Sequence, residues 1–181
     1  MKNPVFLIML CVGPFLATAQ YDSTKVSTKL ETFQSQRNKL FQKEWVEIGK
    51  VRNFLTVQIL NITDLTSGDK ISGLSISWAS TYTVSNHSFL DIDEVEDLKK
   101  SIARMTTFSL SPPPANYTEI QFQSKDFEIS IFPNNQNKTV WKANVKDLDH
   151  PSTSSSYFNA DDLSKLQALI TIAEDKLKKL K

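Results

Sequence analysis

The stretch that decides the fold lies where an extended segment gives way to a helix, residues 88–98, which read SFLDIDEVEDL. Asp91 is a typical helix N-cap residue, and Glu94 stands at the third helical position, where it completes a capping box. Apolar residues then recur at helical spacing and predict a buried stripe formed by Val95, Leu98 and Ile102. The sequence therefore predicts a strand that leads directly into a capped amphipathic helix.

The same pattern returns near the end of the chain. Residues 156–163 read SYFNADDL and align with residues 88–95 without a gap. Each match keeps a structural role, because both segments have an aromatic residue, then a capping Asp or Asn, then an acid at the third helical position. The second apolar stripe is formed by Leu163, Leu166, Ile170, Ala173 and Leu177. This repetition predicts a tandem strand–strand–helix duplication.

A proline-rich segment at 111–115, which reads SPPPA, separates the two halves. Consecutive prolines cannot donate backbone hydrogen bonds and prefer an extended shape, so the segment is interpreted as a stiff spacer. The expected halves are residues 45–110 and 116–181, both parts of one compact domain.

Alternating apolar residues predict antiparallel strands in both halves. The first half has two such runs on either side of a turn at 67–69, formed by Leu55, Val57, Ile59, Leu74, Ile76 and Trp78. The second half has three runs, formed by Ile120, Phe122, Phe127, Ile129, Ile131, Trp141, Ala143 and Val145. The expected fold class is α+β, with antiparallel strands and two or three packed helices.

Residues 20–44 are mostly polar, with sparse apolar residues at helical spacing, namely Val26, Leu30, Phe33, Leu40 and Phe41. This spacing predicts an N-terminal amphipathic helix with a linker. Such a helix is expected to pack on its own sheet rather than on a partner.

The first nineteen residues have the three parts of a secretory signal peptide, namely the positive Lys2, the apolar run 5–16 and the small residues 17–19. Twelve residues are too few to cross a bilayer, which takes roughly twenty. No later stretch is long and apolar enough to span a membrane. We therefore expect cleavage after Ala19 and a periplasmic or secreted chain that begins at Gln20.

Charge and cysteine content argue against several classes of protein. The chain has 21 basic and 20 acidic residues, and both counts are 20 once Lys2 is removed with the signal. Nucleic-acid binders and polybasic membrane-surface proteins are visibly basic, so neither class is favoured. Cys11, the single cysteine, lies inside the signal, so the mature chain is expected to have no disulfide and no cysteine-ligated metal. A lipidated cysteine would follow a small residue, and Leu10 stands there instead.

The sequence lacks the common motifs of catalysis and cofactor binding. His87 and His150 lie in polar segments without metal-ligand spacing, and the four glycines form no phosphate-binding loop. The acidic cluster Asp91, Asp93, Glu94, Glu96 and Asp97 lies at a helix start, where the helix dipole favours negative charge. A calcium site is the alternative for this cluster, but the EF-hand spacing is absent. No residue is assigned a catalytic, cofactor-binding or metal-binding role.

Two features leave a role for carbohydrate open. Glycosylation sequons occur at Asn61, Asn86, Asn116 and Asn137, and their use is not decided by the sequence. Tryptophan rings could stack on a sugar, but Trp78 and Trp141 lie on the apolar faces of their strands. We therefore expect both to be core residues.

Several short segments carry a resemblance to other proteins. They are TDL at 63–65, SGDK at 67–70, SGL at 72–74, residues 91–98, YTEI at 117–120 and DLSKL at 162–166. Together they resemble a family of small exported proteins from Bacteroidetes-like bacteria, and the Ala19-Gln20 end of the signal is similar too. The likeness covers most of the chain from Trp45 onward. It implies a Gram-negative envelope or secreted location, and it carries over no activity, cofactor or catalytic residue.

The function predicted from the sequence is that of an exported, non-enzymatic binding or interaction domain whose partner is a protein or a small-molecule ligand. One alternative is a hydrolase with an unrecognised carboxylate or serine site. A second is single-stranded nucleic-acid binding, because duplicated strand–helix units resemble the whirly or PC4-like fold. Export and zero net charge argue against that second alternative.

Overall fold

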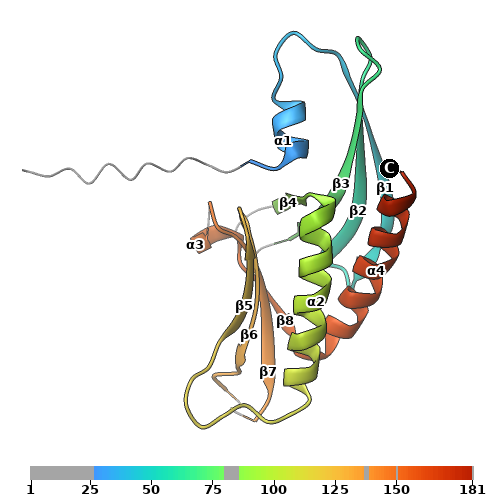
Figure 1. Cartoon of the computed structure of the whole chain (residues 1–181). Helices are drawn as coiled ribbons and strands as arrows, with labels where there is room; N and C mark the ends of the chain where they lie inside the picture. Colours follow the sequence, from blue (N-terminus) through green and yellow to red (C-terminus); the bar gives the residue numbers. More distant parts are fainter. Residues whose placement is uncertain (1–26, 80–85, 137–138, 150, 181) are drawn as a thin grey trace, which may run out of the picture.

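The computed structural model describes residues 27–79, 86–136, 139–149 and 151–180, so the predicted signal peptide at 1–19 lies outside the described residues. The fold class is α+β, as the sequence predicts. Two antiparallel sheets of four strands each have the orders β1-β2-β3-β4 and β5-β6-β7-β8 (Figure 1). Among the described residues, no helix has both the length and the apolar character needed to cross a membrane.

The first sheet is formed by β1 (Phe41–Val51), β2 (Leu55–Asp64), β3 (Lys70–Trp78) and β4 (Asn86–Leu90). The predicted hairpin is the β2–β3 pair, which turns at Gly68 with a φ of 82°. Helix α2 (Ile92–Ser109) follows β4, and its capping box is present, since the Asp91 N–H donates to Glu94 Oε2 at 2.8 Å. The helix start predicted from residues 88–98 is confirmed.

The second sheet is formed by β5 (Ile120–Ser124), β6 (Phe127–Pro133), β7 (Trp141–Asp147) and β8 (Ser156–Asn159). A short helix, α3 (Pro151–Ser154), lies between β7 and β8. After β8 a single 3₁₀ turn, η1 (Ala160–Asp162), leads into α4 (Leu163–Lys179).

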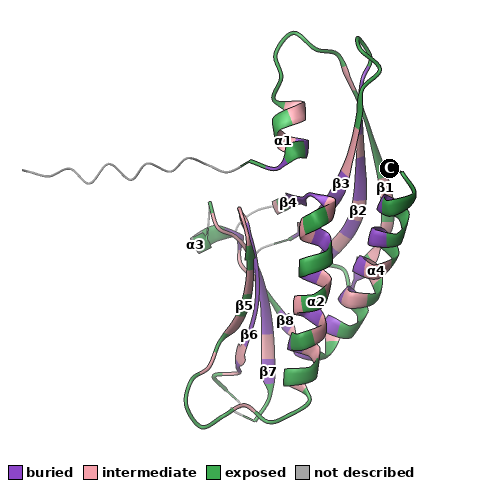
Figure 2. Cartoon of the chain, viewed as in Figure 1, coloured by how far each residue is buried: buried purple, intermediate pink, exposed green. Residues whose placement is uncertain are grey.

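A single large core joins the two halves. It includes the predicted stripes of α2 and α4, which lie side by side, and the inner faces of both sheets (Figure 1; buried residues in Figure 2). Trp78 and Trp141 are 2% and 8% exposed, so their predicted burial is confirmed. The Trp78 Nε1–H of the first half donates to the Ser154 carbonyl of the second half at 2.6 Å. The halves are therefore packed together rather than tethered by the linker alone.

The helix predicted within residues 20–44 is shorter than expected. Helix α1 spans only Lys29–Gln34, and Phe41 already belongs to β1. Phe41 pairs with Asp64 of β2, and the Leu40 carbonyl accepts from the Leu65 N–H just beyond β2. Strand pairing across the sheet thus overrides a weak local pattern. As predicted, α1 packs on its own sheet, where Leu30 is buried against Leu60, Ile62 and Phe89.

The predicted strand–strand–helix repeat is not shown. Each half instead contains four strands in sequential order, followed by a long helix. The residues aligned in the sequence do occupy related places, since Leu98 and Leu166 are both fully buried and Phe89 and Tyr157 both lie on the last strand of their sheets. Superposition of the two halves stays a prediction.

Candidate binding groove on the second sheet

The outer face of the second sheet is the side turned away from α2 and α4 (Figure 1). Successive side chains of a strand point to opposite faces. In β6 and β7 the inward set is apolar and joins the core, so the outward set consists of Glu128, Ser130, Phe132, Lys142, Asn144 and Lys146. This face of the sheet is therefore polar with aromatic members.

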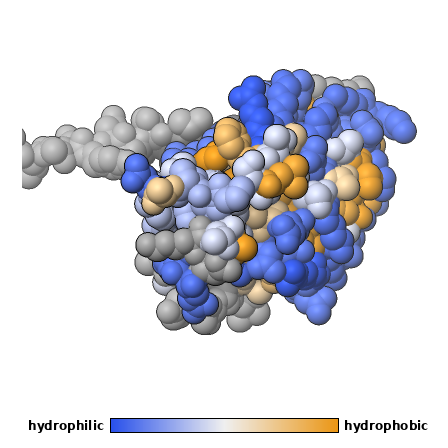
Figure 3. Space-filling view, turned by 90° about the horizontal axis from the view of Figure 1, so that it is seen from below, coloured by the Kyte–Doolittle hydropathy of each residue, from blue (hydrophilic) through white to orange (hydrophobic). Residues whose placement is uncertain are grey.

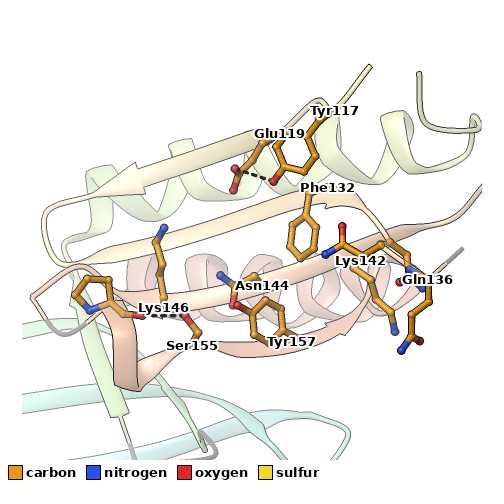
Figure 4. Close-up of a pocket in the computed structure, with 12 residues that line it drawn as sticks. Tyr117, Glu119, Phe132, Gln136, Lys142, Asn144, Lys146, Ser155 and Tyr157 are labelled. Atoms are coloured by element: carbon orange, nitrogen blue, oxygen red, sulfur yellow. Dashed lines mark hydrogen bonds between the residues drawn. The ribbon is translucent and has the colours of Figure 1, made fainter. Parts of the chain in front are cut away.

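An open groove of about 620 Å³ lies over this face and is called the outer groove below. Its lining includes Tyr117 and Glu119 before β5, Phe132 on β6, Lys142, Asn144 and Lys146 on β7, and Tyr157 on β8 (Figure 4). Segments from four parts of the second half thus contribute side chains to one concave surface. A concave surface with a few convergent polar groups is the usual form of a ligand site.

Three aromatic rings follow one another across the outer groove, from Tyr117 to Phe132 to Tyr157 (Figure 4). Tyr117 and Tyr157 are 68% and 66% exposed, which is high for large aromatic side chains. The rings of Phe132 and Tyr157 are perpendicular, with centroids 6.1 Å apart. Because a perpendicular pair is not stacked face to face, flat ring surface stays available to a ligand.

The phenol of Tyr117 is held in its neutral form. Partial burial raises the pKa of Tyr117, and the nearby Glu119 carboxylate raises it further. The hydroxyl donates a hydrogen bond to Glu119 Oε2 at 3.3 Å.

The charged groups of the outer groove are already paired with groups of the same sheet. Lys146 Nζ lies 2.7 Å from Oε1 of the buried Glu128, and Gln123 donates to the other oxygen of that carboxylate at 2.8 Å. Lys142 Nζ donates to Asn159 Oδ1 at 2.7 Å. The groove lining carries Lys142, Lys146 and Glu119, and their formal charges sum to zero only together with the buried Glu128, which pairs with Lys146.

The floor of the outer groove contains polar atoms without partners. Asn144 is only 7% exposed, and its Oδ1 has no hydrogen-bond donor. Ser130 lies directly opposite Asn144 in the sheet, fully buried behind the groove lining, and its Oγ has no partner among the described residues either. A buried polar atom left unpaired costs about 1–3 kcal/mol, so two neighbouring ones need a physical explanation.

The acidic cluster discussed from the sequence serves helix capping and ion pairs. The Asp91 carboxylate accepts hydrogen bonds from the backbone N–H groups of Lys29 and Leu30, at 2.8 and 3.4 Å, and so ties α1 to the start of α2. Glu96 and Asp97 pair with Lys100 one turn later. In the described part of the chain, no group of three His, Cys, Asp or Glu residues could hold a metal ion.

The other residues considered from the sequence lie apart from the outer groove. His87 is exposed on β4 with its ring 5.2 Å from that of Phe89, and His150 lies outside the described residues. Trp45 is 47% exposed on the first sheet. Of the sequon residues, Asn116 is exposed, Asn61 donates to Glu44 within the first sheet, and Asn137 is not described.

Sequence reasoning missed the residues of the outer groove. Phe132 and Asn144 lie within predicted strands, but only their inward neighbours were used to define those strands. The outward-facing residues themselves could have indicated the site. Phe132 and Asn144 alternate with core residues, whereas the outward positions of a solvent-facing strand are usually charged or small.

Exposed apolar residues also occur away from the outer groove. At the end of the molecule where α2 finishes, Figure 3 shows hydrophobic patches scattered among hydrophilic residues. Phe108 and Leu110, 55% and 82% exposed, are the large apolar side chains at the end of α2.

Comparisons with known proteins give little guidance. No protein-family model and no curated protein matches the chain. Among solved structures, the chain is similar to the plant transcriptional regulator PBF-2, with 9% identity, over 78% of this chain and 85% of that one. The TM-score is 0.33, so the likeness supports no conclusion about this protein.

Proposed function

We propose that the protein is an exported, non-enzymatic binding domain that takes its ligand in the outer groove. The observation that carries this proposal is the buried, unpartnered Asn144 Oδ1 at the floor of a groove flanked by two exposed tyrosines. A ligand that donates a hydrogen bond there offsets the cost of the unpaired acceptor. The tyrosine rings supply apolar contact area on either side.

The arrangement is suited to holding a ligand. Lys146 is paired with the buried Glu128, Lys142 donates to Asn159, and Glu119 accepts from Tyr117, so the charged side chains of the lining are already engaged. An open groove of this kind accepts a section of a longer chain as well as a small molecule. Residues on separate strands then contact successive parts of the ligand.

The test is a binding screen against neutral and anionic polysaccharides, single-stranded oligonucleotides and peptides, repeated with Tyr157→Ala and Tyr117→Ala. Each variant is expected to bind the ligand class found in the screen at least tenfold more weakly than the unsubstituted protein does, which corresponds to about 1.4 kcal/mol. Phe108→Ala is the matched control, since it removes an aromatic ring from α2 that is also more than half exposed, and it should leave binding unchanged. Equal affinity of all four proteins for the bound class would contradict the proposed site.

Export is tested separately. N-terminal sequencing or intact mass of the secreted form is expected to start at Gln20, because the small residues 17–19 follow an apolar run of signal-peptide length. A start at a lipid-modified Cys11 would instead indicate a membrane-anchored lipoprotein.

A further inference from the structure

We propose that the ligand of the outer groove is an uncharged glycan, a chain of neutral sugar rings that lies across the three aromatic side chains. This inference rests on the proposed binding function and specifies its ligand class. Three independent features of the groove support it, namely its charge, its hydrogen-bonding floor and its aromatic rings.

The charge of the outer groove favours a neutral ligand. A nucleic acid or acidic polysaccharide is bound mainly by cations that neutralise its anionic groups. Here Lys146 is paired with Glu128, which is buried beneath the lining, and Lys142 is engaged by Asn159. Glu119 places a carboxylate on the lining itself. A polyanion would have to break the Lys146–Glu128 pair and approach the Glu119 carboxylate, whereas a neutral chain meets neither cost.

The floor of the outer groove favours a ligand that donates hydrogen bonds. The unpartnered Asn144 Oδ1 is an acceptor, and phosphate and carboxylate oxygens are acceptors too, so they cannot satisfy it. A sugar hydroxyl both donates and accepts. One hydroxyl of the chain can therefore donate to Asn144, and others can accept from amides elsewhere on the lining such as Gln136.

The aromatic rings favour a ligand with flat apolar faces. The face of a pyranose ring carries C–H groups that pack against an aromatic face and form weak contacts with it. Tyr117 and Tyr157 expose two-thirds of their surfaces on opposite sides of Phe132 (Figure 4). Rings placed in sequence across a groove fit the repeating units of a glycan chain.

The experiment measures binding of the purified protein to amylose, mannan, laminarin and xyloglucan, with alginate and oligothymidylate as anionic probes. We expect binding to at least one neutral polysaccharide, with less than about a twofold change in affinity between low and high salt. Asn144→Leu, which keeps the branching and the number of side-chain heavy atoms but removes the acceptor, and Tyr157→Ala should each lower that affinity at least tenfold. Phe108→Ala should retain it.

The other outcomes separate the two proposals. Failure to bind any of the four neutral polysaccharides would overturn the glycan inference. Salt-sensitive binding of oligothymidylate or alginate would overturn it as well, and loss of that binding in Tyr157→Ala would keep the outer groove as the binding site. Neutral-polysaccharide binding that survives Asn144→Leu, Tyr157→Ala and Tyr117→Ala would overturn both proposals. Circular dichroism of each variant checks folding, and Tyr117, which precedes β5 and is mostly exposed, supplies a variant that leaves the sheet intact.

Discussion

Asp126 is a carboxylate whose environment disfavours its charge. Burial raises the pKa of Asp126, and the Glu31 and Asp147 carboxylates raise it further, although the Ser88 hydroxyl donates to its Oδ1 at 2.7 Å. Since the folded-state pKa lies above the unfolded one, the unfolded chain releases the proton first as pH rises. The free energy of unfolding therefore falls as pH rises from the Asp126 pKa of the unfolded chain to that of the folded protein. The loss persists at neutral pH.

Asp126→Asn is expected to raise the free energy of unfolding at pH 7, because the amide keeps an acceptor for Ser88 and removes the charge. The difference from wild type should vanish at acidic pH, where Asp126 is protonated in both states. Urea unfolding across this pH range measures it. Asp175→Asn, at an exposed position of α4, is the control and should show no such trend; lower stability of Asp126→Asn at pH 7 would contradict the account.

Trp78 connects the two halves through a single side chain. It is 2% exposed, its ring meets that of Phe127 edge-on at 5.9 Å, and its N–H donates to the Ser154 carbonyl. Trp78→Ala should therefore cost about 3–5 kcal/mol in chemical denaturation. Trp78→Phe fills most of the volume but loses the hydrogen bond, so it should cost less than Trp78→Ala. A cost below about 1 kcal/mol for Trp78→Ala would be inconsistent with a core role.

At the scale of elements, α1 is held on the first sheet by a close approach over Gly73. A Cβ at Gly73 would lie 2.7 Å from Leu30 Cδ1 and 3.0 Å from the Leu90 carbonyl oxygen. Gly73→Ala should therefore displace α1 and cost about 1–3 kcal/mol. Hydrogen exchange should show faster exchange of the Lys29 and Leu30 amides, which donate to Asp91 in the native structure.

A double-mutant cycle identifies the contact responsible. In a Leu30→Ala background, Gly73→Ala should cost less than it does alone, because the shorter side chain no longer meets the new methyl group. Additive costs would assign the effect to the Leu90 carbonyl or to the strand itself.

The elements differ in how well the sequence predicts them, for physical reasons. Helix α2 is specified locally, by a capping box and an apolar stripe within a dozen residues, and both are present in the structure. Strand β1 is an edge strand with mostly exposed side chains and a bulge near Gly49, so its alternation is weak and its extent depends on pairing with β2. The outer groove was not predicted at all, because Tyr117 and Tyr157 lie forty residues apart and only the sheet brings them together.

At the scale of the whole molecule, the two sheets and the two long helices share one core. Residues 51–105 and 127–177 contribute to the same buried cluster. Lys99 of α2 pairs with the buried Glu174 of α4 and so ties the two helices together, and Lys178, one turn further along α4, pairs with the same carboxylate. Burial raises the pKa of Glu174, but the two ammonium groups outweigh it and hold the pKa below its usual value. Neither half has a complete core of its own, because α4 of the second half packs on β1 and β2 of the first sheet, and α2 of the first half packs on β5 of the second sheet.

The last prediction follows from this shared core. A protease site inserted in the linker at 111–115 should allow cleavage without separation of the fragments, because the core and the Trp78–Ser154 hydrogen bond hold them together. The cleaved protein should co-elute as one species in size-exclusion chromatography and unfold in a single transition. Residues 27–110 produced alone should lack cooperative unfolding, since their inner sheet face would be open to water. A stable, cooperatively folded 27–110 fragment would show that the halves are independent units, and the interdependence inferred from the core would be wrong.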